Sequence, residues 1–345
     1  MRLKNRDIAE ALGISTTAVS LALNNRPGVS EATRRRVLEL VSDSTQEAIQ
    51  TLNEESETAN RSVLMSIHKK HGYIINDKPF FSDVVETVQQ ELLKANYNMI
   101  LSHYVPEQSL PQYIQYIKAL PISGMLLMAT ELDETNLALY KSLGIPTVLM
   151  DASFDLEDLD SVSLDNCASM LRAFRHAVEM GHRHIGYLRS ATPIANFGHR
   201  LDGFMKGIRE FKLEDAPHPM ISLPCDVQGA YQEMSNYLDA LPAGTELPTV
   251  FLSDLDYIAL GAMSALKEHG WRIPEDVSII GYDDVATSAV SEPPLTTIRV
   301  NQSDLGRFAA KLLMDRIANS GEAHVNMQVS SKLILRGSVK DLRER

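Results

Sequence analysis

The chain has 345 residues, of which 44% are hydrophobic, and its formal net charge is −12. This length allows a large buried core and favours a small domain joined to one or two larger ones. No run of about eighteen apolar residues is present, and the N-terminus lacks the residue order of a signal peptide, so we expect a cytoplasmic protein without membrane contact. The only two cysteines, Cys167 and Cys225, are far apart in the sequence and are expected to be small buried residues rather than a disulfide.

The first forty residues predict a helix-turn-helix. Two short helices over residues 4–24 are separated by Gly13, which can adopt the positive φ of a tight turn. Ser15 is placed to cap the second helix, and Ile8 and Val19 take positions that would meet in a small core. In such a unit the second helix enters the major groove of DNA, where its first residues reach base edges.

A third helix is predicted over residues 31–41, and it carries three consecutive arginines. Residues 1–42 hold seven Lys and Arg against four Asp and Glu, although the whole chain is acidic. A three-helix unit with a polar outer face could serve another purpose, but this basic excess lies where phosphates would be contacted. We therefore predict a DNA-binding domain over residues 1–42. Contacts with double-stranded DNA are expected from Asn5, Thr16, Thr17, Ser20, Leu21, Asn24, Ser30 and Arg34.

Residues 43–60 differ in charge from the segment before them. They contain five acidic residues and no basic residue. Because DNA phosphates would repel such a segment, we expect a solvated linker, or a contact between two subunits, rather than a DNA contact.

From residue 61 the chain alternates between short apolar runs and amphipathic stretches. Buried parallel strands are predicted over residues 62–67, 98–103, 124–128, 147–150, 184–188, 249–253 and 277–282. Helices are predicted between them over residues 83–95, 111–120, 167–180, 201–211, 229–240 and 257–269. This alternation indicates a doubly wound α/β fold, in which ligands bind at the carboxyl ends of the strands.

Several motifs resemble those of the LacI/GalR family of bacterial transcription regulators. In the first domain they are Asp7-Ile-Ala-Glu-Ala-Leu-Gly-Ile-Ser15 and Val29-Ser-Glu-Ala-Thr-Arg-Arg-Arg-Val-Leu38. Further along, and in the family's order, they are Gly181-His-Arg-His-Ile-Gly-Tyr187, Arg200-Leu-Asp-Gly-Phe204, Ile273-Pro-Glu-Asp-Val-Ser-Ile-Ile-Gly-Tyr-Asp-Asp284 and Pro293-Pro-Leu-Thr-Thr-Ile298. The resemblance covers nearly the whole chain. The acidic segment 43–60 departs from the family, because it lacks the residues that form the family's usual hinge helix.

The resemblance implies a periplasmic-binding-protein-like core over residues 61–338, with two subdomains and a ligand cleft between them. One subdomain is expected over about 61–163 and 300–327, the other over about 164–299 and 328–338, with a tail at 339–345. The last strand, residues 328–335, is expected to return to the second subdomain.

An effector site in this cleft is also implied by the resemblance. Arg200 and Asp283 match the family's effector contacts and together suit a polyol, although they could instead form a structural ion pair. Leu255 replaces the family's usual Asn, which would favour a ligand with an apolar edge or a missing hydroxyl. The complete set of expected effector contacts is Phe80, Phe81, Arg200, Leu255, Asp256, Asp283 and Gln302.

These features favour a homodimeric repressor of carbohydrate-utilisation genes that responds to a sugar or sugar derivative. The alternative is a solute-binding or sensory protein in which the altered linker has uncoupled DNA binding. No catalytic motif supports an enzyme, and no cofactor is expected. Three histidines, His176, His182 and His184, lack the neighbouring Cys or carboxylate ligands of a metal site, so no metal is expected.

Overall fold

The computed structural model describes residues 5–23, 28–37, 61–74, 79–154, 157–242 and 244–343. Two compact units are distinguished, Met1–Ser62 and Val63–Arg345. Each unit is built around its own hydrophobic core. No helix among the described residues is both long enough and apolar enough to span a membrane.

The first unit contains the predicted helix-turn-helix. Helix α1 (Asn5–Leu12) is followed by a turn in which Gly13 has a φ of +64°, and helix α2 (Thr16–Leu23) begins after Ser15. The Ser15 hydroxyl accepts the Ala18 backbone N–H at 3.1 Å, which satisfies one of the free N–H groups at the start of α2. Residues 31–37 are helical as well. Their core with the first two helices consists of Ile8, Ala9, Val19, Ala22 and Val37.

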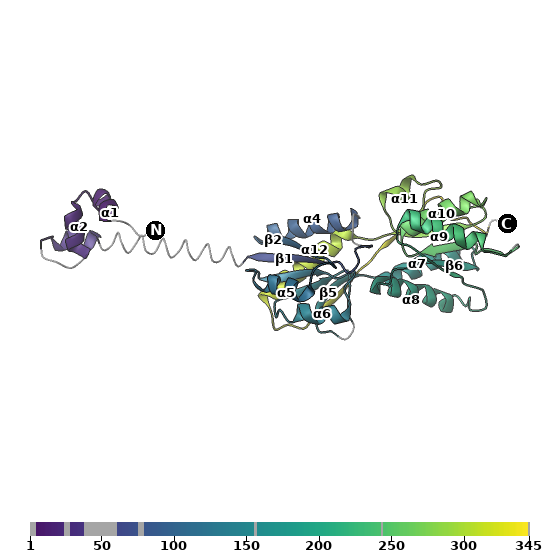
Figure 1. Cartoon of the computed structure of the whole chain (residues 1–345), viewed down its shortest axis with the longest axis horizontal. Helices are drawn as coiled ribbons and strands as arrows, with labels where there is room; N and C mark the ends of the chain where they lie inside the picture. Colours follow the sequence, from purple (N-terminus) through teal and green to yellow (C-terminus); the bar gives the residue numbers. More distant parts are fainter. Residues whose placement is uncertain are drawn as a thin grey trace. The chain divides into compact units, whose positions relative to one another are not determined.

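The second unit is an α/β structure with two six-stranded sheets (Figure 1). In the first sheet the strand order is β11-β5-β4-β3-β1-β2, and in the second it is β12-β10-β9-β8-β6-β7. Strand β10 pairs antiparallel with β12, whereas β1, β3, β4, β5 and β11 join one another in parallel pairs in the first sheet, as β6 to β10 do in the second. We call the first sheet with its helices the first subdomain, and the second sheet with its helices the second subdomain. The predicted doubly wound fold is confirmed.

The first subdomain is built from six strands and four helices of the described chain. The strands are β1 (Ser62–His68), β2 (Asn98–Tyr104), β3 (Gly124–Met128), β4 (Thr147–Met150), β5 (Asp160–Leu164) and β11 (Asn326–Val329). The helices are α4 (Pro79–Lys94), α5 (Leu110–Lys118), α6 (Glu134–Lys141) and α12 (Gln302–Ala318). Apolar side chains on both faces of the sheet are buried, α4 and α12 covering one face and α5 and α6 the other. Because both faces of the sheet are buried, the sequences of its strands are continuous apolar runs.

The second subdomain repeats this layout. Its strands are β6 (Ile185–Ser190), β7 (Met220–Leu223), β8 (Val250–Ser253), β9 (Ser278–Asp283), β10 (Thr296–Arg299) and β12 (Lys332–Ile334). Its helices are α7 (Asn166–Glu179), α8 (Ala195–Glu210), α9 (Val227–Asp239), α10 (Asp256–Glu268) and the short α11 (Ala286–Val290). Helices α7 and α8 cover one face, and α9 and α10 cover the other.

The chain passes between the subdomains at three places: from β5 to α7, from β10 to α12, and from β11 to β12. The prediction of one last strand over residues 328–335 is wrong. Strand β11 pairs with β5 in the first sheet, and β12 pairs with β10 in the second. Between the two strands, the Ser331 carbonyl accepts a hydrogen bond from Arg172 at 2.7 Å, which fixes the chain where it changes sheet.

Candidate functional site: an interdomain cavity and a DNA-binding unit

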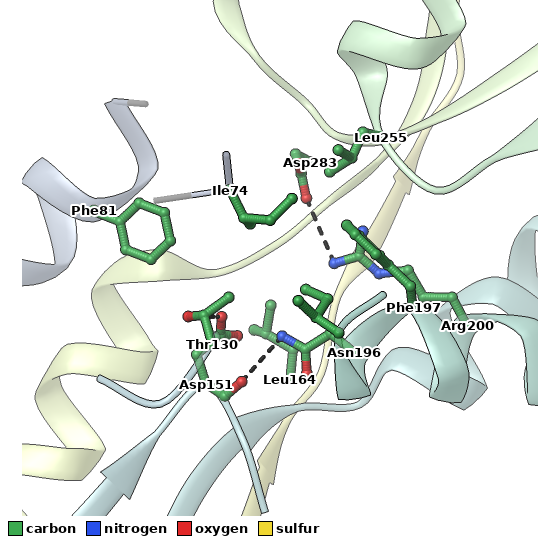
Figure 2. A pocket seen from close by; sticks show the side chains of 11 residues that line it. Ile74, Phe81, Thr130, Asp151, Leu164, Asn196, Phe197, Arg200, Leu255 and Asp283 are labelled. Atoms are coloured by element: carbon green, nitrogen blue, oxygen red, sulfur yellow. Dashed lines mark hydrogen bonds and ion pairs between the residues drawn. The ribbon is translucent and has the colours of Figure 1, made fainter. Parts of the chain in front are cut away.

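A cavity with an empty volume of about 380 Å³, including its open mouth, lies between the two subdomains (Figure 2). Its position follows from the fold, because Thr130, Asp151, Leu255 and Asp283 lie at or just beyond the carboxyl ends of parallel strands from both sheets. The lining residues are Ile74, Phe81, Thr130, Asp151, Leu164, Ile194, Asn196, Phe197, Arg200, Leu255 and Asp283. Most of the wall is apolar, and its charged groups are two carboxylates and one guanidinium.

Arg200 is buried, and two of its three nitrogens, Nε and Nη1, donate hydrogen bonds. Its Nε donates to the Asn166 Oδ1 at 2.9 Å, and its Nη1 donates to the backbone carbonyl of Asp254. The guanidinium also lies over the Tyr282 ring, 3.6 Å from the ring centroid. Its Nη2 is 3.8 Å from the Asp283 Oδ1, so the ion pair between the two expected effector residues is present. Arg200 therefore organises the cavity wall as well as facing the cavity.

Asp151 presents an acceptor to the same cavity. Its backbone has a φ of +60°, and its Oδ2 accepts the Thr130 hydroxyl at 2.7 Å. Its Oδ1 is buried and has no hydrogen-bond partner among the residues that the structure describes. Burial raises the pKa of Asp151 to about 6. A buried acceptor without a partner is costly, so a ligand with a hydroxyl or N–H group at this point would relieve that cost.

Asn196 on α8 contacts the same residue from the second subdomain. Its side-chain Nδ2 donates to the Asp151 backbone carbonyl at 3.0 Å, and its Oδ1 accepts from the Asn166 Nδ2 at 3.1 Å. The amide thus joins the two cavity walls directly.

The expectation for Asp256 is wrong, because this residue is fully buried outside the cavity. Its carboxylate accepts hydrogen bonds from the Thr297 hydroxyl at 2.6 Å, the Ser288 hydroxyl at 2.8 Å and the Val285 backbone N–H at 2.9 Å. Burial raises the pKa of Asp256 to about 7. A Cβ at Gly281 would lie 2.0 Å from the Asp256 Oδ1, so the absence of a side chain there makes room for this carboxyl. Asp256 therefore ties α10 to the segments around α11 and β10.

The other expected effector residues divide between the cavity wall and positions away from it. Phe81 and Leu255 line the cavity. Gln302 begins α12 and is not among the residues that line the cavity. The Phe80 side chain lies outside the described residues. Sequence reasoning missed Ile74, Thr130, Asp151, Leu164, Ile194, Asn196 and Phe197. Of these, Thr130 and Asp151 follow predicted strands and could have been found from that position alone.

In the first unit, the expected DNA-contacting residues differ in their exposure. Thr16, Thr17 and Ser30 are exposed, whereas Ser20 and Leu21 are partly buried. Arg34 forms an ion pair with Glu31 at 3.2 Å, and its side chain is 18% exposed. Asn24 and the Asn5 side chain lie outside the described residues.

Of the histidines singled out in the sequence, His182 makes structural contacts. His182 is buried, and its ring contacts the Thr249 hydroxyl at 2.9 Å and the Lys340 carbonyl at 3.1 Å. Within the described part of the chain, no group of His, Cys, Asp and Glu residues is arranged to hold a metal ion.

A helix-turn-helix unit joined to a two-subdomain α/β core with a cavity at its strand ends is the architecture of a DNA-binding regulator. The family model for bacterial regulatory proteins, lacI family, matches residues 6–57, and the model for a periplasmic binding protein-like domain matches residues 174–339. The HTH-type transcriptional repressor PurR of Haemophilus influenzae (strain PittEE) is 31% identical over 348 residues, covering 98% of each chain. The chain therefore belongs to the lacI family and is a transcriptional regulator, not an enzyme.

Solved structures agree on the fold. A transcriptional regulator CelR–cellobiose complex is similar with a TM-score of 0.70 at 22% identity, covering 98% of this chain and 100% of that one. A LacI family transcriptional regulator from Enterococcus faecalis V583 with bound ribose is similar with a TM-score of 0.66 at 25% identity, covering 81% of this chain and 99% of that one.

Proposed function

We propose that this regulator is a homodimeric repressor of carbohydrate-utilisation genes, released from or recruited to its operator by a sugar-like effector in the interdomain cavity. The observation that carries the proposal is Asp151, which lines a cavity walled by both subdomains and whose buried Oδ1 has no hydrogen-bond partner among the described residues. An occupant of this cavity contacts both subdomains at once, so its binding shifts their relative arrangement. Coupling of this kind is typically about 1–3 kcal/mol.

The charges of the cavity favour an uncharged ligand that donates hydrogen bonds. Two carboxylates, Asp151 and Asp283, face the cavity, whereas Arg200 already donates to Asn166 and Asp254 and lies near Asp283. A phosphate or carboxylate would meet these acceptors with Arg200 as the one cation among the described lining residues, and that cation already lies beside Asp283. Sugar hydroxyls supply donors without charge, and their C–H faces suit the apolar side chains around them. Similar regulators with bound ribose or cellobiose support this class of effector.

A thermal-shift comparison tests the effector class. We expect a neutral monosaccharide or deoxy sugar to raise the unfolding temperature by several degrees at a concentration of about 100 times its Kd, where binding stabilises by about 2.7 kcal/mol. Ribose against ribose 5-phosphate is the matched pair, since the two differ only by the anionic group. Nucleosides and oligosaccharides complete the screen.

The Asp151→Asn variant is the control for this screen, because it keeps the shape of the side chain and alters its acceptors. We expect it to reduce the shift produced by the neutral sugar. Leu255→Asn is expected to improve binding of a fully hydroxylated hexose relative to its deoxy analogue. A larger shift with the sugar phosphate than with the neutral sugar would contradict the proposed class.

The DNA-binding part of the proposal rests on the first unit and its basic residues. Selection from random duplex DNA is expected to enrich a near-palindrome, because a dimer places two helix-turn-helix units on two half-sites. Base preference is expected to depend on Thr16, Thr17 and Leu21, with Ser20, Ser30 and Arg34 contacting the backbone. Affinity is expected to fall by about 10³-fold or more between 50 and 200 mM salt if six or more phosphates are contacted.

Leu21→Arg provides the specificity test, since arginine can reach guanine where leucine can only touch a thymine methyl. This variant should change the selected base at one position of each half-site and leave the half-site spacing unchanged. Failure to enrich any palindrome would instead favour a sensory protein with uncoupled DNA binding. The acidic linker at residues 43–60, whose charge raises that alternative, lies outside the described residues.

A further inference from the structure

Glu131 follows β3, and its buried carboxylate accepts hydrogen bonds from the backbone of a neighbouring loop. Its Oε2 accepts the backbone N–H groups of Lys70, His71 and Gly72 at 2.9, 3.0 and 2.8 Å. Its Oε1 accepts the Ile74 backbone N–H at 3.0 Å. One side chain thus fixes four of the five residues from 70 to 74, directly after the loop leaves β1.

This carboxylate is held in its charged form. Burial by itself would raise the pKa of Glu131, but the backbone hydrogen bonds from the loop outweigh that effect and keep its pKa below the ordinary value. Hydrogen bonds to a charged carboxylate are stronger than the same number of hydrogen bonds between neutral groups. The loop is therefore fastened to the first subdomain at a defined position.

At its far end the loop places Ile74 against the second subdomain. Ile74 is 6% exposed and belongs to the hydrophobic cluster that contains Phe197 and Leu255, two residues of the second subdomain. Figure 2 shows its side chain pointing into the cavity, between Phe81 on one side and Leu255 and Asp283 on the other. The side chain thus lines the cavity and bridges its two walls.

We propose that Glu131 is a positioning residue for a latch, residues 70–74, which holds the two subdomains together through Ile74. Glu131 does not line the cavity and acts through the loop backbone. Because Ile74 occupies part of the cavity wall, an occupant must either fit beside this side chain or displace it. The latch itself is independent of the proposed function, and only the identification of the occupant as an effector rests on it.

Two substitutions separate the two ends of the latch. Glu131→Gln replaces one acceptor oxygen by an amide that cannot accept, so either orientation of the new side chain leaves at least one loop N–H without its partner. Ile74→Ala removes the contact with the second subdomain but leaves Glu131 and its hydrogen bonds in place. Lys70→Ala is the matched control, because it removes only the exposed ion pair between Lys70 and Asp133 on the same loop.

Both readouts are made on the full-length protein without ligand. Amide hydrogen exchange measures how firmly the loop is held. We expect Glu131→Gln to speed exchange at residues 70–74 at least tenfold and to leave exchange in β8 unchanged. In Ile74→Ala and Lys70→Ala, exchange at residues 70–74 should stay within about twofold of the wild-type rate.

The distance between spin labels at positions 90 and 232, one in each subdomain, measures how far the cavity is open. The labels are placed in a protein in which Cys167 and Cys225 are replaced by alanine. We expect a broader and longer distance distribution for Glu131→Gln and Ile74→Ala, and the wild-type distribution for Lys70→Ala.

The outcomes distinguish positioning from general support of the fold. Equal acceleration of exchange at residues 70–74 and in β8 would show that Glu131 merely stabilises the protein, and would overturn the proposal. Unchanged loop exchange in Glu131→Gln, or an unchanged distance distribution in Ile74→Ala, would also overturn it. Because no ligand is added, these results do not depend on the effector screen.

Discussion

Replacing Arg200 by alanine is expected to lower the free energy of unfolding of the second unit by about 3–5 kcal/mol, as for other buried charges that lose their partner. The substitution leaves the Asn166 Oδ1 and the Asp254 carbonyl without the Arg200 donors. It also removes the cation beside the Asp283 carboxylate and the Asp254 side chain, whose pKa burial raises to about 6. Urea unfolding followed by circular dichroism measures the loss.

Two further variants show which contact matters. Arg200→Lys keeps the charge but loses the planar fork, so we expect an intermediate loss. Asp283→Ala is expected to cost much less, because its side chain is 16% exposed and its ion pair is long. Effector response should be weakened in all three variants. An unfolding midpoint of Arg200→Ala equal to that of wild type would show that its contacts with Asn166 and Asp254 add nothing to stability.

Replacing Asp256 by asparagine is expected to change how stability depends on pH. The pKa of Asp256 is raised by burial to about 7, whereas the unfolded chain has the ordinary value near 4. Below pH 4 the carboxyl is protonated in both states, so its contribution to stability is fully present. As the pH rises from 4 to 7 the unfolded chain ionises first, and this contribution is lost, on the order of 4 kcal/mol in total. Asparagine is neutral throughout and should not show that loss.

The comparison of variant with wild type isolates this one group. Asp151 and Asp254, whose pKa values burial raises to about 6, act in the same direction as Asp256. His68 and His182, whose pKa values burial lowers to about 4, act in the opposite direction and reduce stability as the pH falls below about 6.5. These contributions are common to both proteins and cancel in the comparison. The unfolding free energy of the variant, measured relative to that of the wild type, should therefore increase from pH 4 to pH 7. A constant difference would mean that Asp256 titrates normally in the folded protein.

The sequence by itself determined the local elements and the class of protein. Gly13, Ser15 and the spacing of Ile8 and Val19 predicted the helix-turn-helix, because these features act within a few residues of each other. Strands β3 and β4 were predicted at their observed bounds, since parallel strands buried on both faces are continuous apolar runs. The order of family motifs then placed Arg200 and Asp283 at a cavity between two subdomains.

Only the tertiary structure decided which polar groups remain available at that cavity. Arg200 is engaged by Asn166 and Asp254, which lie 34 and 54 residues away in the sequence, so no local pattern could show that its donors are used. Asp256 was expected in the cavity and is instead enclosed by hydroxyls 32 and 41 residues further along the chain. The split of residues 326–334 between two sheets likewise depends on pairing with β5 and β10 rather than on the composition of the segment. Secondary structure follows from neighbouring residues, whereas the hydrogen-bonding capacity of a site depends on which distant strand ends the fold brings together.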